Sequence, residues 1–247
     1  MQLEHIEAVV RPRNPWEAID LGFSLVRHWW YPLGIIWLSL VIPLILIIYS
    51  LLYTHFIWAI ILVWWLKPLY DRIVLYFLSR ALFGARPGVV QLLKALPQIL
   101  TQTRLIAALF WERLHFTRAF KLPIWQLEGL NRQAGQHRLV QLRTHSAHQA
   151  QLLTWVCLSF EWLIQMTLIG LMYLMLPSYY EGIEWLLEQQ PIPLKLLWIA
   201  IHLSALTLVE PLYVAGGFSL YLNRRIHLEG WDIELVFRQI AKRLSPQ

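Results

Sequence analysis

The sequence predicts an all-α, polytopic integral membrane protein with four transmembrane helices, amphipathic cytoplasmic helices and both termini in the cytoplasm. Three observations lead to this fold class. Hydrophobic residues make up 57% of the 247 residues and charged residues only 15%, whereas soluble domains carry about 25% charged residues. Residues 31–66 contain no Asp, Glu, Lys or Arg. Most of the Lys and Arg residues lie in segments on one side of the predicted spans.

The uncharged stretch predicts a first transmembrane hairpin over residues 31–83. About 20 helical residues cross a hydrocarbon layer of about 30 Å, so this stretch is too long for one crossing. Its most polar and aromatic part, residues 50–56, predicts a turn. We therefore expect one helix at 31–53 and a second from 55 to 83.

Two further apolar runs predict a second transmembrane hairpin over residues 152–222. The first run covers 152–176 and ends before Pro177, and the second covers 194–222. Each is long enough to cross a bilayer. The connection between them, residues 177–193, is expected to be a periplasmic loop.

The distribution of Lys and Arg predicts the orientation. Residues 1–30 carry three of them, residues 84–151 nine and residues 223–247 five, whereas residues 177–195 carry one. Cytoplasmic segments of membrane proteins are enriched in Lys and Arg. The sequence therefore predicts that both termini and the middle segment lie in the cytoplasm.

The terminal cytoplasmic segments each predict an amphipathic helix. In residues 1–30, Asn14 is typical of an N-cap and Pro15 of the first helical position. This helix is expected to lie along the membrane surface before the first span. Residues 223–247 predict a second amphipathic helix after the last span.

The middle segment, residues 84–151, predicts a cytoplasmic helical region. Amphipathic stretches occur near 88–95 and 98–119, and a break is expected at residues 121–123, where a proline follows Lys-Leu. The basic residues of this region favour contact with anionic lipid head groups. They do not predict nucleic-acid binding, because the aromatic residues typical of such sites are not interleaved with them.

Charged residues inside the predicted spans are the candidate site. An isolated charge in a span costs at least about 2.5–3.5 kcal/mol, so such groups are expected to face the protein interior and pair. At about 1.5 Å per helical residue, four of them lie roughly 14–18 Å from the cytoplasmic helix ends, and Lys67 lies somewhat deeper. They form the predicted charge cluster: Lys67, Asp71, Arg72, Glu161 and Glu210.

Two roles are open for the predicted charge cluster. Polar groups between membrane helices fix the helix register; alternatively, the cluster forms a proton or ion pathway or a site for a polar ligand. A break at Lys67-Pro68 is a further alternative. It would place Lys67, Asp71 and Arg72 near water and remove the need for pairing.

The sequence predicts no catalytic residues, cofactor or metal site. It contains none of the zinc-protease, phosphate-binding, dinucleotide-binding or serine-hydrolase motifs. Glu161 and Glu210 are the one acid/base pair that an intramembrane enzyme would use, and such an enzyme requires a cavity that holds both carboxylates. Cys157 is a single cysteine in an apolar run, and His145 and His148 lack further ligands nearby.

Several phrases of the sequence occur together in one known family. They are RNPWEAIDLG (13–22), WWLKPLYDR (64–72) with LSRALFG (78–84), LPIWQLEGL (122–130) and GFSLYLNRRIHLEGWDIELVFR (217–238). In these phrases the chain resembles a family of bacterial inner-membrane proteins encoded beside MoxR-type AAA+ ATPases, von Willebrand factor A proteins and transglutaminase-like proteins. The resemblance implies a role beside an ATPase-linked system and assigns no catalytic residues.

These observations predict a non-enzymatic scaffold or accessory subunit of a membrane protein complex. Its partners are expected to be the lipid bilayer, including anionic head groups, and other membrane or cytoplasmic proteins, with a MoxR-type ATPase system as one candidate. The residues expected to dock a partner are Trp231, Asp232, Glu234 and Phe237. The alternative is a small transporter or an ion- or proton-conducting subunit that uses the predicted charge cluster.

Overall fold

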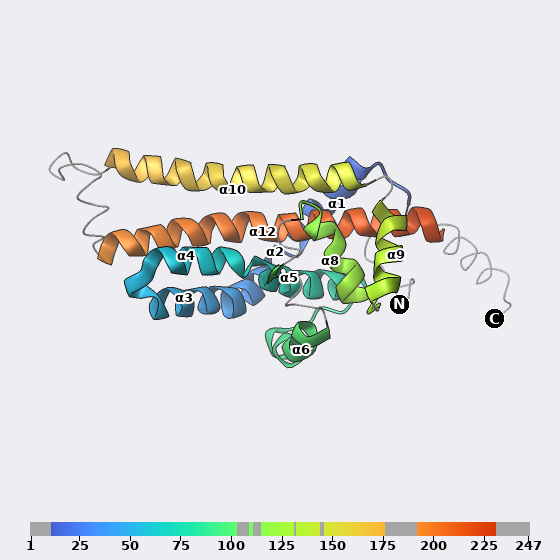
Figure 1. Cartoon of the computed structure of the whole chain (residues 1–247), viewed down its shortest axis with the longest axis horizontal. Helices are drawn as coiled ribbons and strands as arrows, with labels where there is room; N and C mark the ends of the chain where they lie inside the picture. Colours follow the sequence, from blue (N-terminus) through green and yellow to red (C-terminus); the bar gives the residue numbers. More distant parts are fainter. Residues whose placement is uncertain are drawn as a thin grey trace.

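The described part of the chain is entirely helical. The computed structural model describes residues 11–102, 109–110, 115–130, 132–143, 146–175 and 192–230, and these contain helices and no strands. Two long helices, α10 (Ala147–Met175) and α12 (Ile192–Glu229), lie side by side. In Figure 1, α12 runs between α10 and the shorter helices α3 (Ile42–Leu51), α4 (Phe56–Trp65) and α5 (Lys67–Leu82).

Three helical segments are long and apolar enough to cross a membrane: Trp30–Leu51, Ala147–Met175 and Leu194–Glu229. The prediction of an all-α membrane protein is confirmed at this level. The predicted second span, residues 55–83, is not one continuous helix in the structure.

The first candidate span contains a local widening of the helix. It consists of α2 (Trp30–Ile36), the π-helical turn η2 (Trp37–Val41) and α3 (Ile42–Leu51). Pro43 has no N–H to donate to the carbonyl four residues earlier, and its ring crowds that carbonyl. The π turn accommodates this, since the N–H of Ile42 bonds to the carbonyl of Trp37, five residues back.

A second proline explains the break in the next apolar segment. After the short turn η3 (Tyr53–His55), α4 (Phe56–Trp65) ends, and α5 (Lys67–Leu82) begins with Pro68 at its second position. Pro68 cannot continue the hydrogen bonds of α4, and it restricts the residue before it. The expectation of an unbroken helix from 55 to 83 is therefore wrong, and the alternative break at Lys67-Pro68 is present.

The last helix is longer than its apolar run. The expected end at residue 222 is wrong, because α12 continues through Asn223 and Ile226 to Glu229 and ends at Gly230, whose φ is 62°. The polar residues after Leu222 are compatible with helix, and glycine is the first residue suited to the left-handed conformation that ends one. Residues 231–247, which hold the rest of the predicted C-terminal helix, lie outside the described residues.

The middle segment differs from its prediction at two prolines. Instead of two stretches separated near residue 96, α6 (Val89–Gln102) runs through Pro97. The expected break at 121–123 is also wrong, because α8 (Arg118–Leu127) runs through Pro123. Burial of every residue from Ala119 to Trp125 offsets the cost of about 3 kcal/mol for an internal proline. A separate helix, α9 (Arg132–Arg143), precedes α10.

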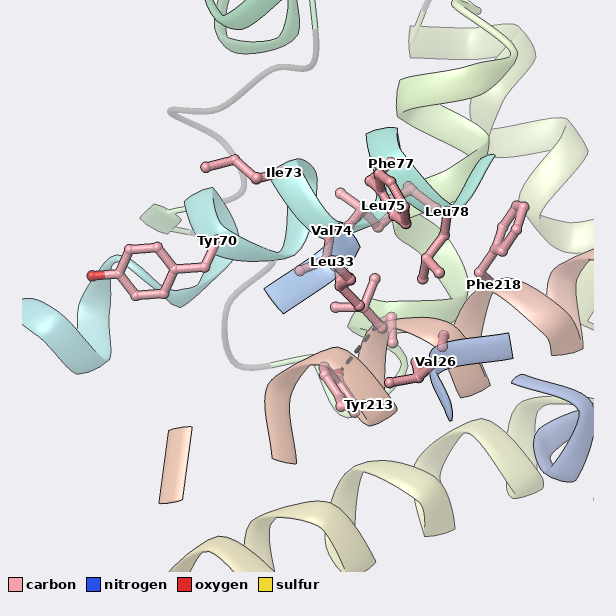
Figure 2. Packing of buried hydrophobic residues seen from close by; sticks show 14 of the residues in the cluster. Val26, Leu33, Tyr70, Ile73, Val74, Leu75, Phe77, Leu78, Tyr213 and Phe218 are labelled. Atoms are coloured by element: carbon pink, nitrogen blue, oxygen red, sulfur yellow. Dashed lines mark hydrogen bonds between the residues drawn. The ribbon is translucent and has the colours of Figure 1, made fainter. Parts of the chain in front are cut away.

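The core lies where α5, α8 and the N-terminal helix α1 (Pro15–His28) pack on α12. Figure 2 shows Val74, Phe77 and Leu78 of α5 close to Phe218 of α12 and Val26 of α1, and all five are buried. Helix α5 is thus buried on nearly all sides. This differs from a lipid-facing span, which exposes one face to lipid.

The N-cap prediction for α1 is confirmed: the side chain of Asn14 accepts a hydrogen bond from the N–H of Trp16 at 3.2 Å. The same helix lies against α12 at a glycine. A Cβ on Gly22 would lie 2.5 Å from the carbonyl oxygen of Ala215. Gly217 makes an equally close approach to Ala119 of α8. Small residues on α12 therefore allow two helices to approach its backbone.

We predict that Gly22→Ala destabilises the protein by about 1–3 kcal/mol, because the added methyl forces α1 away from the backbone of α12. Gly34→Ala is the matched control, since nothing lies within 4 Å of a Cβ at that position. Thermal unfolding in mild detergent measures both variants. Equal melting temperatures for the two variants would contradict the close packing.

Candidate functional site

The break before α5 places a lysine inside the bundle. Lys67 is the first residue of α5, and its Nζ lies 2.5 Å from Oε2 of Glu161 on α10 and 3.1 Å from Oε2 of Glu210 on α12. One ammonium group therefore joins three helices that are far apart in the sequence.

A second cation comes from the start of α8. The Nε of Arg118 lies 3.0 Å from Oδ2 of Asp71, and its Nη2 lies 3.3 Å from Oε1 of Glu210. The guanidinium also lies over the ring of Tyr213, 5.4 Å from the ring centroid. Glu210 thus uses one oxygen for Arg118 and the other for Lys67. We call Lys67, Asp71, Arg118, Glu161 and Glu210 the observed charge cluster.

The cluster is almost completely removed from solvent. Exposed fractions are 1% for Asp71, 2% for Glu210, 3% for Lys67 and 5% for Glu161. Burial alone lowers the pKa of Arg118, but Asp71 and the other negative groups around it raise that pKa above its ordinary value, so the guanidinium stays charged. Charges at this burial are stable only when they are paired, and each of these groups has an opposite partner.

Not every residue of the predicted charge cluster belongs to the observed charge cluster. Lys67 contacts both Glu161 and Glu210, and Asp71 is connected to Glu210 through Arg118. Arg72 is buried, and its Nη1 donates a hydrogen bond to the carbonyl oxygen of Pro68 at 2.6 Å.

The alternative prediction was that a break at Lys67-Pro68 would remove the need for pairing. The break is present, but the need for pairing remains. Lys67 is buried and paired despite the break. The reason is that α5 continues into the core of the bundle instead of running along a membrane surface.

Arg118 was missed because it lies in a basic, non-spanning segment and was expected to be at the membrane interface. The one signal in the sequence is the charge count. Three carboxylates and two cations at similar depth leave one negative charge, and a third cation balances the set. The sequence does not show that α8 inserts its first residue between α5 and α12.

A cavity of about 150 Å³ reaches the cluster. Its charged wall consists of Lys67, Arg118, Glu161 and Glu210. At the outer part of the lining, Trp64 and Phe116 are 39% and 43% exposed. The cavity therefore holds both carboxylates of the one acid/base pair that the sequence offers. Both carboxylates, however, contact the same ammonium group, so neither is an unpaired base.

No candidate metal site occurs among the residues that the structure describes. No group of three or more His, Cys, Asp or Glu side chains with metal-binding geometry occurs there. His148 is exposed, and His145 lies outside the described residues. Cys157 is buried and lines the cavity.

A second polar network holds the end of α12. The hydroxyl of Tyr221 donates to Oε1 of Glu128 at 2.6 Å, and Nη2 of Arg225 lies 2.7 Å from Oε2 of Glu229. Arg138 of α9 pairs with both Glu128 and Glu229. This set, the Glu128–Glu229 network, joins the end of α8 and the middle of α9 to α12.

The chain before α1 is also bound to the end of α12, through Asn223. Oδ1 of Asn223 accepts the backbone N–H of Arg13 at 2.9 Å, and Nδ2 of Asn223 donates to the carbonyl of Arg13 at 2.9 Å. The predicted docking residues Trp231, Asp232, Glu234 and Phe237 follow this region but lie outside the described residues.

Comparison with protein-family models, with curated proteins and with solved structures gives no match to the chain. The family resemblance stays a prediction, and the site is interpreted from its own geometry.

We predict that Glu210→Gln lowers the stability of the protein more than Glu161→Gln does. Glu210 neutralises two buried cations and Glu161 one, and loss of one partner of a buried pair costs about 3–5 kcal/mol. Thermal unfolding in detergent measures the difference. Glu17→Gln, which removes an exposed partner of Arg11, is the control and should change stability by less than about 1 kcal/mol. A larger effect for Glu161→Gln than for Glu210→Gln would contradict the shared role of Glu210.

Proposed function

We propose that the protein is a non-enzymatic scaffold or accessory subunit of a bacterial inner-membrane complex, which connects its membrane helices to partner proteins in the cytoplasm. One observation carries this proposal. The end of α12 binds the chain before α1 through Asn223 and binds α8 and α9 through the Glu128–Glu229 network. A membrane helix that extends into a fixed layer of three other segments is suited to presenting that layer to a partner.

The proposed topology has four crossings with both termini in the cytoplasm. The 26 residues of α4 and α5 together span about 39 Å at 1.5 Å per residue, which is sufficient for the fourth crossing despite the break. The excess of Lys and Arg in residues 1–30, 84–151 and 223–247 supports the orientation. The link to a MoxR-type ATPase system rests on the family resemblance.

Pairing inside the bundle supports a non-enzymatic role. Glu161 and Glu210 share Lys67, and Glu210 also neutralises Arg118. A general base requires a carboxylate that is free to accept a proton near the reacting atom. In the observed charge cluster the carboxylates instead stabilise the arrangement of α5, α8, α10 and α12.

The proposed docking segment begins directly after the end of α12. Trp231, Asp232, Glu234 and Phe237 follow Gly230 in the sequence, and Gly230 directly follows Glu229 of the Glu128–Glu229 network. Tryptophan is among the residues that dominate the binding energy of protein interfaces, and Trp231 is the tryptophan of this segment.

We predict that Trp231→Ala reduces co-purification of the partner by at least about tenfold, since an interface tryptophan commonly contributes 2 kcal/mol or more. Affinity purification in mild detergent followed by quantitative mass spectrometry measures the loss. Tyr173→Ala is the matched control, because Tyr173 is an exposed aromatic residue near the far end of α10. Equal partner yields from wild type and Trp231→Ala, at equal expression, would contradict the proposed docking segment.

A second function, an ion- or proton-conducting subunit, is favoured by the cavity that reaches the cluster. Further along α12, His202 is buried beside the ring of Tyr49, with 6.4 Å between the ring centroids. For this function, a proton flux across proteoliposomes that is lost in Glu210→Gln is expected. A flux equal to that of empty liposomes in wild type would exclude it.

A further inference from the structure

The cavity at the observed charge cluster presents both signs of charge to a ligand. Lys67 and Arg118 lie on its wall together with Glu161 and Glu210, and Asp71 pairs with Arg118 behind the wall. The wall therefore offers ammonium and guanidinium donors as well as carboxylate acceptors. A ligand that carries one positive and one negative group can bind to both kinds of side chain.

Two polar atoms of the cavity wall have no hydrogen-bond partner among the described residues. Glu161 contacts Lys67 through Oε2, and its Oε1 has no partner among the described residues. Arg118 uses Nε and Nη2 in its ion pairs, which leaves Nη1 without a partner in the same part of the chain. The first atom accepts hydrogen bonds from an ammonium group, and the second donates to a phosphate or carboxylate.

The cavity opens beside aromatic side chains. Trp64 and Phe116 are partly exposed at its lining, and Phe116 stacks on the exposed Trp155 of α10 with 5.1 Å between ring centroids. Further along α10, Phe160 and Leu163 expose large apolar side chains. An apolar tail attached to a ligand in the cavity would therefore lie against α10, where a bilayer supplies lipid chains.

The volume fits a small ionic head group. A cavity of about 150 Å³ corresponds to roughly five water molecules at about 30 Å³ each. A space of this size with charged walls can hold water or a ligand group of several heavy atoms.

We propose that this cavity binds the ammonium–phosphate head group of an ethanolamine phospholipid. The ammonium group donates to Oε1 of Glu161, and the phosphate accepts from Nη1 of Arg118 and from Lys67. The acyl chains leave past Phe116 and Trp155. An ethanolamine head group is favoured over choline, because the trimethylated nitrogen of choline has no N–H to donate to the carboxylate.

Native mass spectrometry of the full chain, purified in mild detergent and supplied with defined lipids, tests this proposal. Phosphatidylethanolamine, phosphatidylcholine and phosphatidylglycerol are offered in equal amounts. We expect one retained phosphatidylethanolamine, with about tenfold preference over each of the other two, which is the scale of one charge-assisted hydrogen bond.

Two variants test the location of the site. Leu158→Trp fills the cavity without removing a charge, and Glu161→Gln removes the acceptor charge; both should abolish the preference. Leu171→Trp is the matched control on the same helix, because Leu171 is exposed, does not line the cavity and lies further along α10 than Phe160 and Leu163, so the preference should stay. If Glu161→Gln fails to fold, Leu158→Trp still tests the proposal.

Three outcomes would overturn the proposal. One is equal retention of the three lipids by wild type. Another is a preference that survives Leu158→Trp. The third is binding of soluble phosphoethanolamine with no retention of the phospholipid, which would assign the same head-group chemistry to a water-soluble ligand.

Discussion

The ammonium group of Lys67 lies between two carboxylates on two other helices, and the arrangement of the bundle depends on it. A lysine in an apolar interior is stable only when opposite charges are within reach. This requirement fixes the rotation of α5, α10 and α12, because each must direct one charged residue to the same point. Arg118 extends the constraint to α8 through Asp71 and Glu210. Apolar packing between these helices is less specific, since many rotations bury similar apolar area.

Polar contacts hold helix α12 at two places along its length, in its middle and at its end. In its middle, Glu210 balances the cations of the bundle. At its end, Asn223 binds the chain before α1, and Arg225 and Glu229 belong to the Glu128–Glu229 network, which binds α8 and α9. Between the two places, glycines allow close approach of neighbouring helices, as Gly217 does with Ala119.

Sequence patterns predicted the features that depend on composition along the chain. The apolar runs predicted the three candidate spans to within a few residues at most ends. The charges inside the four predicted spans included Lys67, Glu161 and Glu210, which the structure brings together. The break at Pro68 was available as an alternative because proline has a local effect that needs no tertiary information. The end of α12 was misplaced because the end of an apolar run marks a change of environment, whereas a helix continues until a residue such as Gly230 ends it.

Features that depend on which helices meet were not predictable from one sequence. Arg118 joins the cluster only because α8 inserts its first turn against α5 and α12. Pro123 was expected to break a helix that burial maintains. The cavity is likewise lined by residues of α4, α5, α8, α10 and α12, and no local pattern marks it.

A double-mutant cycle between Lys67 and Glu161 tests the central claim most directly. The free energy of unfolding in detergent is measured for wild type, Lys67→Met, Glu161→Gln and the double variant. We expect each single variant to be destabilised and the double variant to lose less than the sum, with a coupling energy of about 1–3 kcal/mol, because the two groups are a contacting ion pair. Additive effects, with a coupling energy near zero, would contradict the account.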